Sequence, residues 1–259
     1  MSSTTTAAGA ATDAANALLT IDNLGKRFGG FVALDGIDLS IALGERLGLI
    51  GPNGSGKSTL VNCLCGTLRN ETGSVVFDGR RLDGLIAHER TRLGLARSFQ
   101  LPKPFHTMDL IDNIRVPLLY TVNARHGRPH LLGPQIEARC RELLAEVGLA
   151  EKATRLPRDL TQVEMRKLEL ARAVATEPRL LFADEAMAGL SPSEVEEIIV
   201  VLLRLNEQGI TIVLIEHIMR AVMSFSTRLV VLVAGHKIAD GVPAEVMRNP
   251  EVEKAYLGE

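Results

Sequence analysis

Apolar and polar residues alternate along two segments near the N-terminus. The alternation predicts half-buried strands over 18–24 and 31–41. Short apolar runs predict further strands over 46–50 and 73–78, and the residues from 58 to 68 have helical character. We therefore expect the N-terminal third to be rich in strands, with one helix.

The segment from about 101 to 160 differs from the N-terminal part in its residue pattern. Proline residues punctuate it, and two helices fit between them, over 109–120 and 134–147. Gly148 stands where a helix is expected to stop. This pattern predicts a helical subdomain inserted into the chain at about 101–160.

Strands and helices alternate again in the C-terminal part. The expected elements are helices over 161–176, 192–208 and 217–226 and strands over 179–183, 210–215, 228–234 and 236–240. Ser191 is the natural N-cap of the helix that starts at Pro192, and Glu194 completes a capping box. The alternation predicts an α/β protein whose largely parallel sheet is covered on both faces.

Composition and charge narrow the classes of partner. The chain has 259 residues with 29 basic and 31 acidic side chains, a formal charge of −2, and a pI near 6.3. The protein therefore has no bulk basic surface for nucleic acid. Aromatic residues are only 3% and Trp is absent, which disfavours a base-stacking platform. Cys63, Cys65 and Cys140 have neither disulfide nor zinc-site spacing, so we expect small buried residues.

The chain shows no run of about 18 apolar residues, the length that a membrane span needs. Residues 1–17 are small and polar, without the basic start and apolar stretch of a secretory signal. We interpret 1–17 as a disordered tail and 18–259 as the folded domain. The expected location is the cytosol, where the protein remains free to dock on a membrane protein.

A phosphate-binding loop is the strongest chemical signal. The pattern G-x-x-x-x-G-K-[ST] is matched in full by Gly51, Pro52, Asn53, Gly54, Ser55, Gly56, Lys57 and Ser58, with Thr59 following. The glycines let backbone N–H groups converge on phosphate, and the helix N-terminus adds positive charge. Lys57 is expected to reach the outer phosphates, and the Ser58 hydroxyl to ligate Mg²⁺.

Two adjacent carboxylates follow the apolar strand over 179–183. In a parallel sheet, ligands bind at the C-terminal ends of the strands. Asp184 is therefore expected to hold Mg²⁺, directly or through water. Glu185 is expected to orient or deprotonate the attacking water.

Three further residues gain meaning from their positions. Gln100, where the helical insertion begins, is a candidate to touch Mg²⁺ and sense the γ-phosphate. His217 ends a strand and is a candidate to hydrogen-bond a γ-phosphate oxygen. Phe28 precedes Gly29-Gly30 and is a candidate to stack on adenine.

Taken in order, the loop, Gln100, Asp184-Glu185 and His217 resemble an ABC-transporter ATP-binding subunit over residues 18–259. Some segments resemble the branched-chain amino acid uptake subgroup more specifically. These are LGLARSFQLPKPF, DEAMAGLSPSE, the Ile-Glu-His triplet 215–217, and the tail GHKIADGVPAEVMRNPEVEKAYLGE.

The resemblance implies a P-loop NTPase fold with a RecA-like core, an antiparallel β edge that helps to hold adenine, and a helical subdomain. It implies ATP and Mg²⁺ as cofactors and a head-to-tail dimer with a second ATP-binding subunit, the same or different. It also implies integral membrane permease subunits as partners, at the cytoplasmic face of the inner membrane, and no nucleic acid. Amino acids are the implied solute, with amides or urea as alternatives.

The chain departs from the family at the signature loop. Leu-Ser-Gly-Gly-Gln aligns with residues 160–164, where both glycines are replaced, by Gln162 and Val163. Thr161 keeps a hydroxyl and forms a capping box with Glu164. By resemblance, Thr161 caps the γ-phosphate of ATP held by the other subunit. The added side chains, with Ala186 in place of the usual Pro, put communication across the dimer in question.

Two functional hypotheses therefore stay open. The first is an ATPase that drives an importer. The second is an ATP-binding regulatory partner with weak turnover of its own in a heterodimeric transporter. A DNA-maintenance or translation ATPase is disfavoured because the single cassette lacks heptad runs and basic extensions. A small-molecule kinase would not need Gln100, Asp184-Glu185 and His217 in this order.

Overall fold

The computed structural model describes residues 17–98, 102–125, 127 and 130–257. Two predictions fall outside them: the tail over 1–16, and Gln100. Ala17, assigned above to the tail, is the first residue of a strand.

An antiparallel sheet is built from the N-terminal strands. Its strands are β1 (Ala17–Phe28), β2 (Phe31–Ala42), β4 (Thr72–Phe77) and β5 (Arg80–Arg81), in the order β2-β1-β4-β5. A turn at Gly29-Gly30 joins β1 to β2 and sets Phe28 opposite Phe31. The antiparallel edge implied by the family resemblance is thus present.

A second sheet forms the centre of the molecule. Its strands are β3 (Arg46–Ile50), β6 (Leu95–Ser98), β7 (Leu180–Asp184), β8 (Thr211–Ile215), β9 (Arg228–Val233) and β10 (His236–Gly241). The order is β10-β9-β3-β8-β7-β6. The pairs from β9 to β6 are all parallel, and only β10 runs antiparallel to its neighbour. This confirms the predicted largely parallel sheet.

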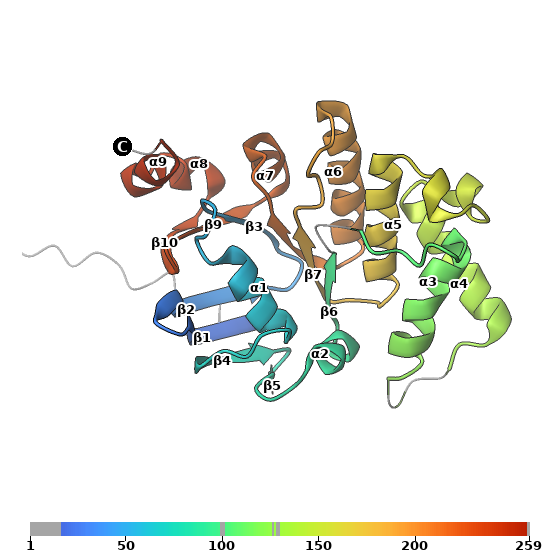
Figure 1. Cartoon of the computed structure of the whole chain (residues 1–259), viewed down its shortest axis with the longest axis horizontal. Coiled ribbons are helices and arrows are strands. Elements are labelled where there is room, and N and C mark those ends of the chain that lie inside the picture. The colour runs from blue at the N-terminus through green and yellow to red at the C-terminus, as the bar shows by residue number, and fades with distance from the viewer. Residues whose placement is uncertain (1–16, 99–101, 126, 128–129, 258–259) are drawn as a thin grey trace, which may run out of the picture.

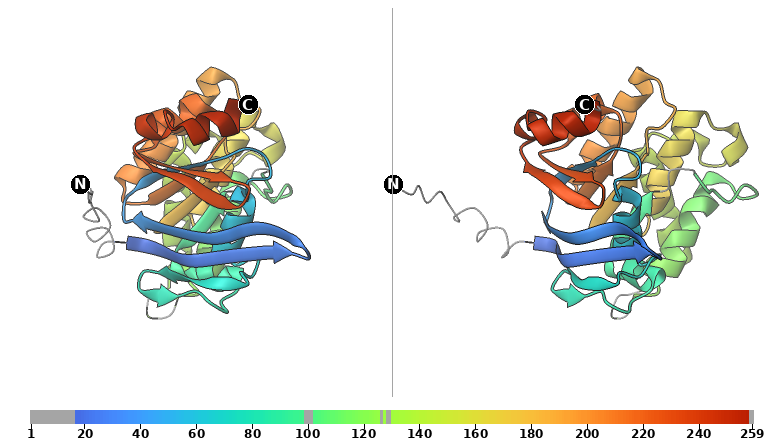
Figure 2. Two further views of the ribbon diagram at one scale, coloured as in Figure 1. Left: turned by 90° about the vertical axis from the view of Figure 1, so that its left-hand side faces the viewer. Right: turned by 60° about the vertical axis from the view of Figure 1, so that its left-hand side comes forward.

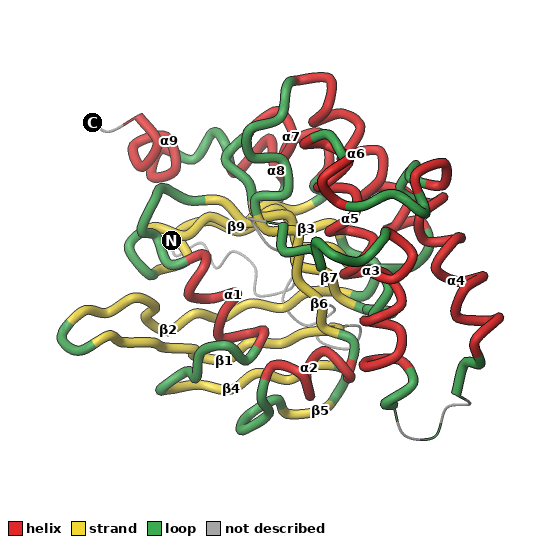
Figure 3. The backbone as a smooth tube through the Cα atoms, turned by 45° about the vertical axis from the view of Figure 1, so that its right-hand side comes forward, coloured by secondary structure: helices red, strands yellow, loops and turns green. Residues whose placement is uncertain are grey.

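Helices cover the sheets and extend the molecule at one end (Figure 1). They are α1 (Lys57–Cys65), α2 (Ala87–Leu93), α3 (Leu110–Pro117), α4 (Gly133–Glu146), α5 (Gln162–Val174), α6 (Pro192–Glu207), α7 (Met219–Phe225), α8 (Pro243–Val246) and α9 (Pro250–Leu257). Helices α3 and α4 lie beyond α5, to the right in Figure 1 and again in the tube of Figure 3. The subdomain boundary at 101–160 stays a prediction.

The central sheet separates two apolar cores. Alternate side chains point to opposite faces of a strand. Along β7, Phe182 packs with α1 and the antiparallel sheet, whereas Leu181 and Ala183 pack with α5 and α6. Figure 2 shows the resulting layers, with the blue antiparallel strands below the orange helices. The loops at the C-terminal strand ends are therefore held by rigid layers on both sides.

Helix caps fix where several chain segments begin. Ser191 caps α6 and Thr161 caps α5, and Glu194 and Glu164 complete the two predicted capping boxes. The predicted helix over 217–226 begins only at Met219, so His217 lies in the loop after β8. The helix predicted over 58–68 ends at Cys65, because Gly66 adopts a left-handed conformation with φ of 76°.

Candidate functional site

The loop between β3 and α1 has the backbone that the motif requires. Gly54 and Gly56 have φ values of 79° and 104°, which disfavour other residues. A Cβ atom on Gly51 would lie 2.1 Å from the Leu232 carbonyl oxygen, and one on Gly56 would lie 2.7 Å from that of Ala33. The glycines therefore allow the loop to pack tightly against its neighbours.

Lys57 begins α1 and turns its side chain back over the loop. Its side chain is buried, and its ammonium donates hydrogen bonds to the carbonyl oxygens of Gly51 and Pro52, at 2.7 and 3.0 Å. Burial lowers the pKa of Lys57, while the nearby charges of Glu185 and Asp184 act in the opposite direction. The ammonium is thus held by carbonyl dipoles within the loop, close to two carboxylates.

A cavity of about 240 Å³ brings most of the predicted site residues together. It is lined by Phe28, Phe31, Ala33, Asn53, Gly54, Ser55, Gly56, Lys57, Ser58, Thr59, Glu185 and His217. Among the described lining residues, neither Thr161 nor Asp184 appears. The structure therefore gathers loop residues 53–59, Phe28, Glu185 and His217 into one site. Gly51, Pro52, Thr161 and Asp184 do not line it.

The aromatic side of this cavity has two members rather than one. Phe28 and Phe31 are 48% and 63% exposed, and they face each other across the β1–β2 hairpin. The Lys26 ammonium lies 5.4 Å from the centroid of the Phe28 ring. Sequence reasoning missed Phe31, although a two-residue turn at Gly29-Gly30 would have predicted its pairing with Phe28.

Glu185 and His217 meet at the ends of neighbouring strands. His217 Nε2 and Glu185 Oε1 are 3.3 Å apart. Glu185 has a φ of 48°, and its N–H donates to the Ile215 carbonyl oxygen at 2.9 Å. The left-handed turn directly after β7 directs the Glu185 side chain into the cavity, so the predicted pair of residues is assembled.

Asp184 has a cation as its partner. It ends β7 and is 4% exposed. Two nitrogens of Arg97, Nη2 and Nε, donate to Asp184 Oδ2 at 2.5 and 3.1 Å. Arg97 lies on β6, a four-residue strand that the sequence analysis did not predict.

The donor set suits a magnesium ion that is shared with phosphate. No three His, Cys, Asp or Glu side chains gather into a possible metal site within the described part of the chain. Mg²⁺ needs only one or two protein oxygen ligands when phosphates and waters complete its octahedron. Ser58 supplies a hydroxyl beside the loop, and Asp184 supplies a carboxylate at the C-terminal end of β7. These hard oxygen donors fit the ion.

The altered signature loop keeps an ordered helix start. Val163 is the second residue of α5, and its side chain is buried. Gln162 Nε2 lies 3.5 Å from the Ala188 carbonyl oxygen, to which Arg166 Nη2 donates at 3.0 Å. Residues 162 and 166 thus connect this loop to the loop after β7.

Glu216 is a second buried carboxyl besides Asp184, and it contacts the loop after β7. It is 2% exposed and accepts the Met187 N–H at 2.8 Å and the His217 N–H at 3.3 Å. Burial raises the pKa of Glu216 to about 7, and the charge of Glu185 adds to the rise. Sequence reasoning quoted Glu216 only as part of a triplet and gave it no role.

We expect Glu216 to make the stability of the protein depend on pH. Its folded pKa lies above the usual value of 4.5, so the folded state binds more protons than the unfolded state between about pH 4.5 and 7. The free energy of unfolding should therefore fall as pH rises through this window, by up to about 3 kcal/mol. Urea unfolding of wild type and Glu216→Gln at pH 5 and 7 measures this. An equal change in both proteins would contradict the assignment.

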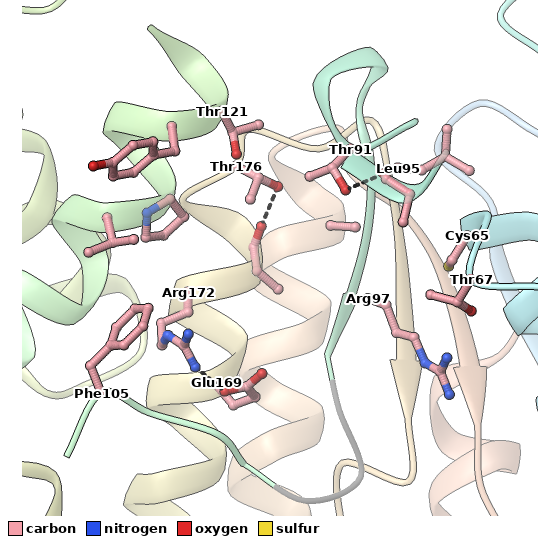
Figure 4. Close-up of a pocket in the computed structure, with 16 residues that line it drawn as sticks. Cys65, Thr67, Thr91, Leu95, Arg97, Phe105, Thr121, Glu169, Arg172 and Thr176 are labelled. Carbon is pink, nitrogen blue, oxygen red and sulfur yellow. Dashed lines mark hydrogen bonds and ion pairs between the residues drawn. The ribbon is translucent and has the colours of Figure 1, made fainter. Parts of the chain in front are cut away.

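A second cavity, of about 380 Å³, lies between β6 and the helices α3 and α5 (Figure 4). Arg97, Cys65 and Thr67 stand on one side of it, and Phe105 and Arg172 on the other. The Arg172 guanidinium lies 5.1 Å from the Phe105 ring centroid. The cavity is mainly apolar and reaches the side chain that holds Asp184.

Comparisons with known proteins agree with this geometry. A family model described as ABC transporter matches residues 34–188, and one described as branched-chain amino acid ATP-binding cassette transporter matches 236–259. The chain is 37% identical over 250 residues to a branched-chain amino acid transport ATP-binding protein, BraF, of Pseudomonas aeruginosa, covering 93% of this chain and 98% of the relative. It is 36% identical over 255 residues to LivG of Escherichia coli, with the same coverage.

Solved structures give the same result. A nucleotide-free ATP-binding cassette from an ABC transporter superposes with a TM-score of 0.83 at 30% identity, covering 94% of this chain and all of that one. An ATP-binding cassette in its ADP conformation gives a TM-score of 0.82 at 30% identity, covering 94% and 99%. Within the described residues, every helix is too short or too polar to cross a bilayer.

Proposed function

Because this chain belongs to the ABC transporter ATP-binding family, we propose that it hydrolyses ATP to energise an importer of branched-chain amino acids. The observation that carries the proposal is the cavity in which the phosphate loop, Glu185 and His217 meet. The matched tail over 236–259 and the names of the relatives favour branched-chain amino acids as the solute.

The cavity is lined both by the phosphate loop and by two aromatic rings. We assign the triphosphate to the loop residues 51–58, whose glycines expose backbone N–H groups at the start of α1. Lys57 would exchange its two carbonyl contacts for phosphate oxygens. We assign the adenine to Phe28 and Phe31, whose exposed rings also line the cavity.

The hydrolytic step is assigned to the pair at the strand ends. Glu185 would accept a proton from the attacking water or orient it, and His217 would donate a hydrogen bond to a γ-phosphate oxygen. Lys57 would offset charge that develops on the phosphates. Ser58, Asp184 and Gln100 would hold Mg²⁺, which when bound neutralises charge on the phosphate oxygens.

The partners follow from the proposed task. We place a segment of the membrane permease at the cavity between β6, α3 and α5 (Figure 4), since it is apolar and lies next to the Asp184 partner Arg97. The chain would then lie at the cytoplasmic face of the inner membrane. A second ATP-binding subunit would meet the loop at Thr161, which lies outside the cavity.

The regulatory alternative draws support from the signature loop. Gln162 and Arg166 both contact the Ala188 carbonyl oxygen, so the signature loop is joined to the loop after β7 within one chain. On this alternative, the chain binds ATP but turns it over appreciably only when paired with a different ATP-binding subunit.

Reconstitution tests the proposal. The chain is assembled in liposomes with candidate permease subunits and a solute-binding protein, with ATP inside or outside. We expect leucine uptake that requires ATP on the side carrying this chain, with urea and an amide as control solutes. Absence of leucine uptake alongside brisk uptake of a control solute would contradict the proposed solute. Brisk ATP turnover by the chain alone would remove the regulatory alternative.

A further inference from the structure

Arg97 connects three parts of the site that are far apart in sequence. Its Nη1 donates to Asn62 Oδ1 on α1 at 2.5 Å, and its Nη2 and Nε donate to Asp184 Oδ2. The side chains of Arg97 and Asp184 are only 17% and 6% exposed. Several N–H groups of the planar guanidinium donate at once, so the Arg97 side chain is held more rigidly than one in a flexible surface ion pair.

The contact occupies the carboxylate that the proposed function assigns to the metal. Asp184 Oδ2 accepts both Arg97 hydrogen bonds, so this oxygen is engaged by a cation in the structure. A guanidinium and a divalent cation repel each other at such short range. Arg97 and Mg²⁺ therefore compete for the same negative charge, whether the ion binds the carboxylate directly or through water.

Open space for a displaced Arg97 adjoins its side chain. The side chain also lines the 380 Å³ cavity between β6 and the helices α3 and α5, beside Cys65 and Thr67 (Figure 4). The guanidinium can thus swing away from Asp184 without being forced into a packed core.

Resting on the proposed function, we propose that Arg97 is a positioning residue that holds the Asp184 carboxylate and competes with Mg²⁺ for it. Arg97 keeps the buried carboxylate paired. It releases the carboxylate when a magnesium nucleotide enters. Removal of the Arg97 charge should therefore strengthen the dependence of nucleotide binding on Mg²⁺.

Calorimetry of ADP binding, with excess EDTA or with Mg²⁺, tests this proposal. The dissociation constant in EDTA divided by the dissociation constant in Mg²⁺ measures the contribution of Mg²⁺ to binding. We expect Arg97→Gln to raise this ratio by about tenfold over wild type, the scale of one charge-assisted contact. The affinity in EDTA should stay the same, because Arg97 does not line the phosphate cavity. Arg97→Lys should fall between the two.

Arg228→Gln is the matched control. Arg228 forms a two-bond contact with Asp240, at 2.6 and 2.8 Å, away from the cavity. The control should lose thermal stability without a change in the Mg²⁺ ratio. A ratio in Arg97→Gln and Arg97→Lys that equals or falls below that of wild type would overturn the proposal. Failure of wild type to bind ADP under either condition would instead overturn the proposed function.

Discussion

Replacement of Glu185 by Gln is expected to lower ATP turnover by about 10²- to 10³-fold while ATP still binds. Loss of a general base or water-orienting carboxylate typically costs this much in rate. Gln keeps the size of the side chain but cannot accept a proton. Its contact with His217, now 3.3 Å from the carboxylate, would remain as a neutral hydrogen bond. Phosphate release at saturating ATP, alongside calorimetric ATP binding, measures the two effects separately.

Glu142→Gln provides the control for this substitution. Glu142 lies on α4 and pairs with Arg139 at the surface, remote from the cavity. It should leave turnover unchanged. Turnover of Glu185→Gln at the wild-type level would show that Glu185 has no role in the hydrolytic step.

Replacement of Lys57 by Ala is expected to weaken ATP binding by at least about a hundredfold. The ammonium is the buried cation of the cavity, and hydrogen bonds to charged groups contribute about 1.5 to 3 kcal/mol each. The substitution also leaves the carbonyl oxygens of Gly51 and Pro52 without this donor. Equilibrium binding of a fluorescent ATP analogue, displaced by ATP, measures the loss.

Lys237→Ala is the matched control for Lys57. Lys237 pairs with Asp240 on β10, outside the cavity, so its removal should not alter ATP affinity. Equal affinities of Lys57→Ala and wild type would mean that the phosphates do not bind at residues 51–58.

The parts of the fold that could be predicted from sequence are those coded by contiguous residues. The strand over 46–50 was predicted at its observed bounds because it is a short apolar run, and its residues from 47 to 50 are all buried. The capping boxes at Ser191 and Thr161 fixed two helix starts. By contrast, β6 is only four residues long and follows α2 directly, so its pattern is too short to separate from a helix.

The difference between local motifs and contacts distant in sequence also explains which parts of the site were predicted. The loop over 51–58 and the pair Asp184-Glu185 are local motifs, and the structure places the loop and Glu185 in one cavity. Arg97 was missed because its contact with Asp184 spans 87 positions along the chain. The importance of Glu216 likewise depends on burial among β8 and the loop at Met187, which no local pattern indicates.

The signature loop illustrates a prediction that a local pattern left incomplete. In the sequence, Val163 stands where the family has a glycine and adds a side chain there. In the structure it is the second residue of α5, and its side chain is buried against the helical core. The capping box of Thr161 and Glu164 provides the helix start without glycine. The effect of Gln162 and Val163 on the dimer contact stays a prediction.

The central claim is that residues 51–58 enclose the triphosphate of ATP in a magnesium-dependent site. Calorimetric titration of the purified chain with ATP, in the presence and absence of Mg²⁺, tests it most directly. We predict one ATP bound per chain, with a dissociation constant below about 1 mM and tighter binding when Mg²⁺ is present. No heat of binding with either ATP or ADP in the presence of Mg²⁺ would contradict the claim.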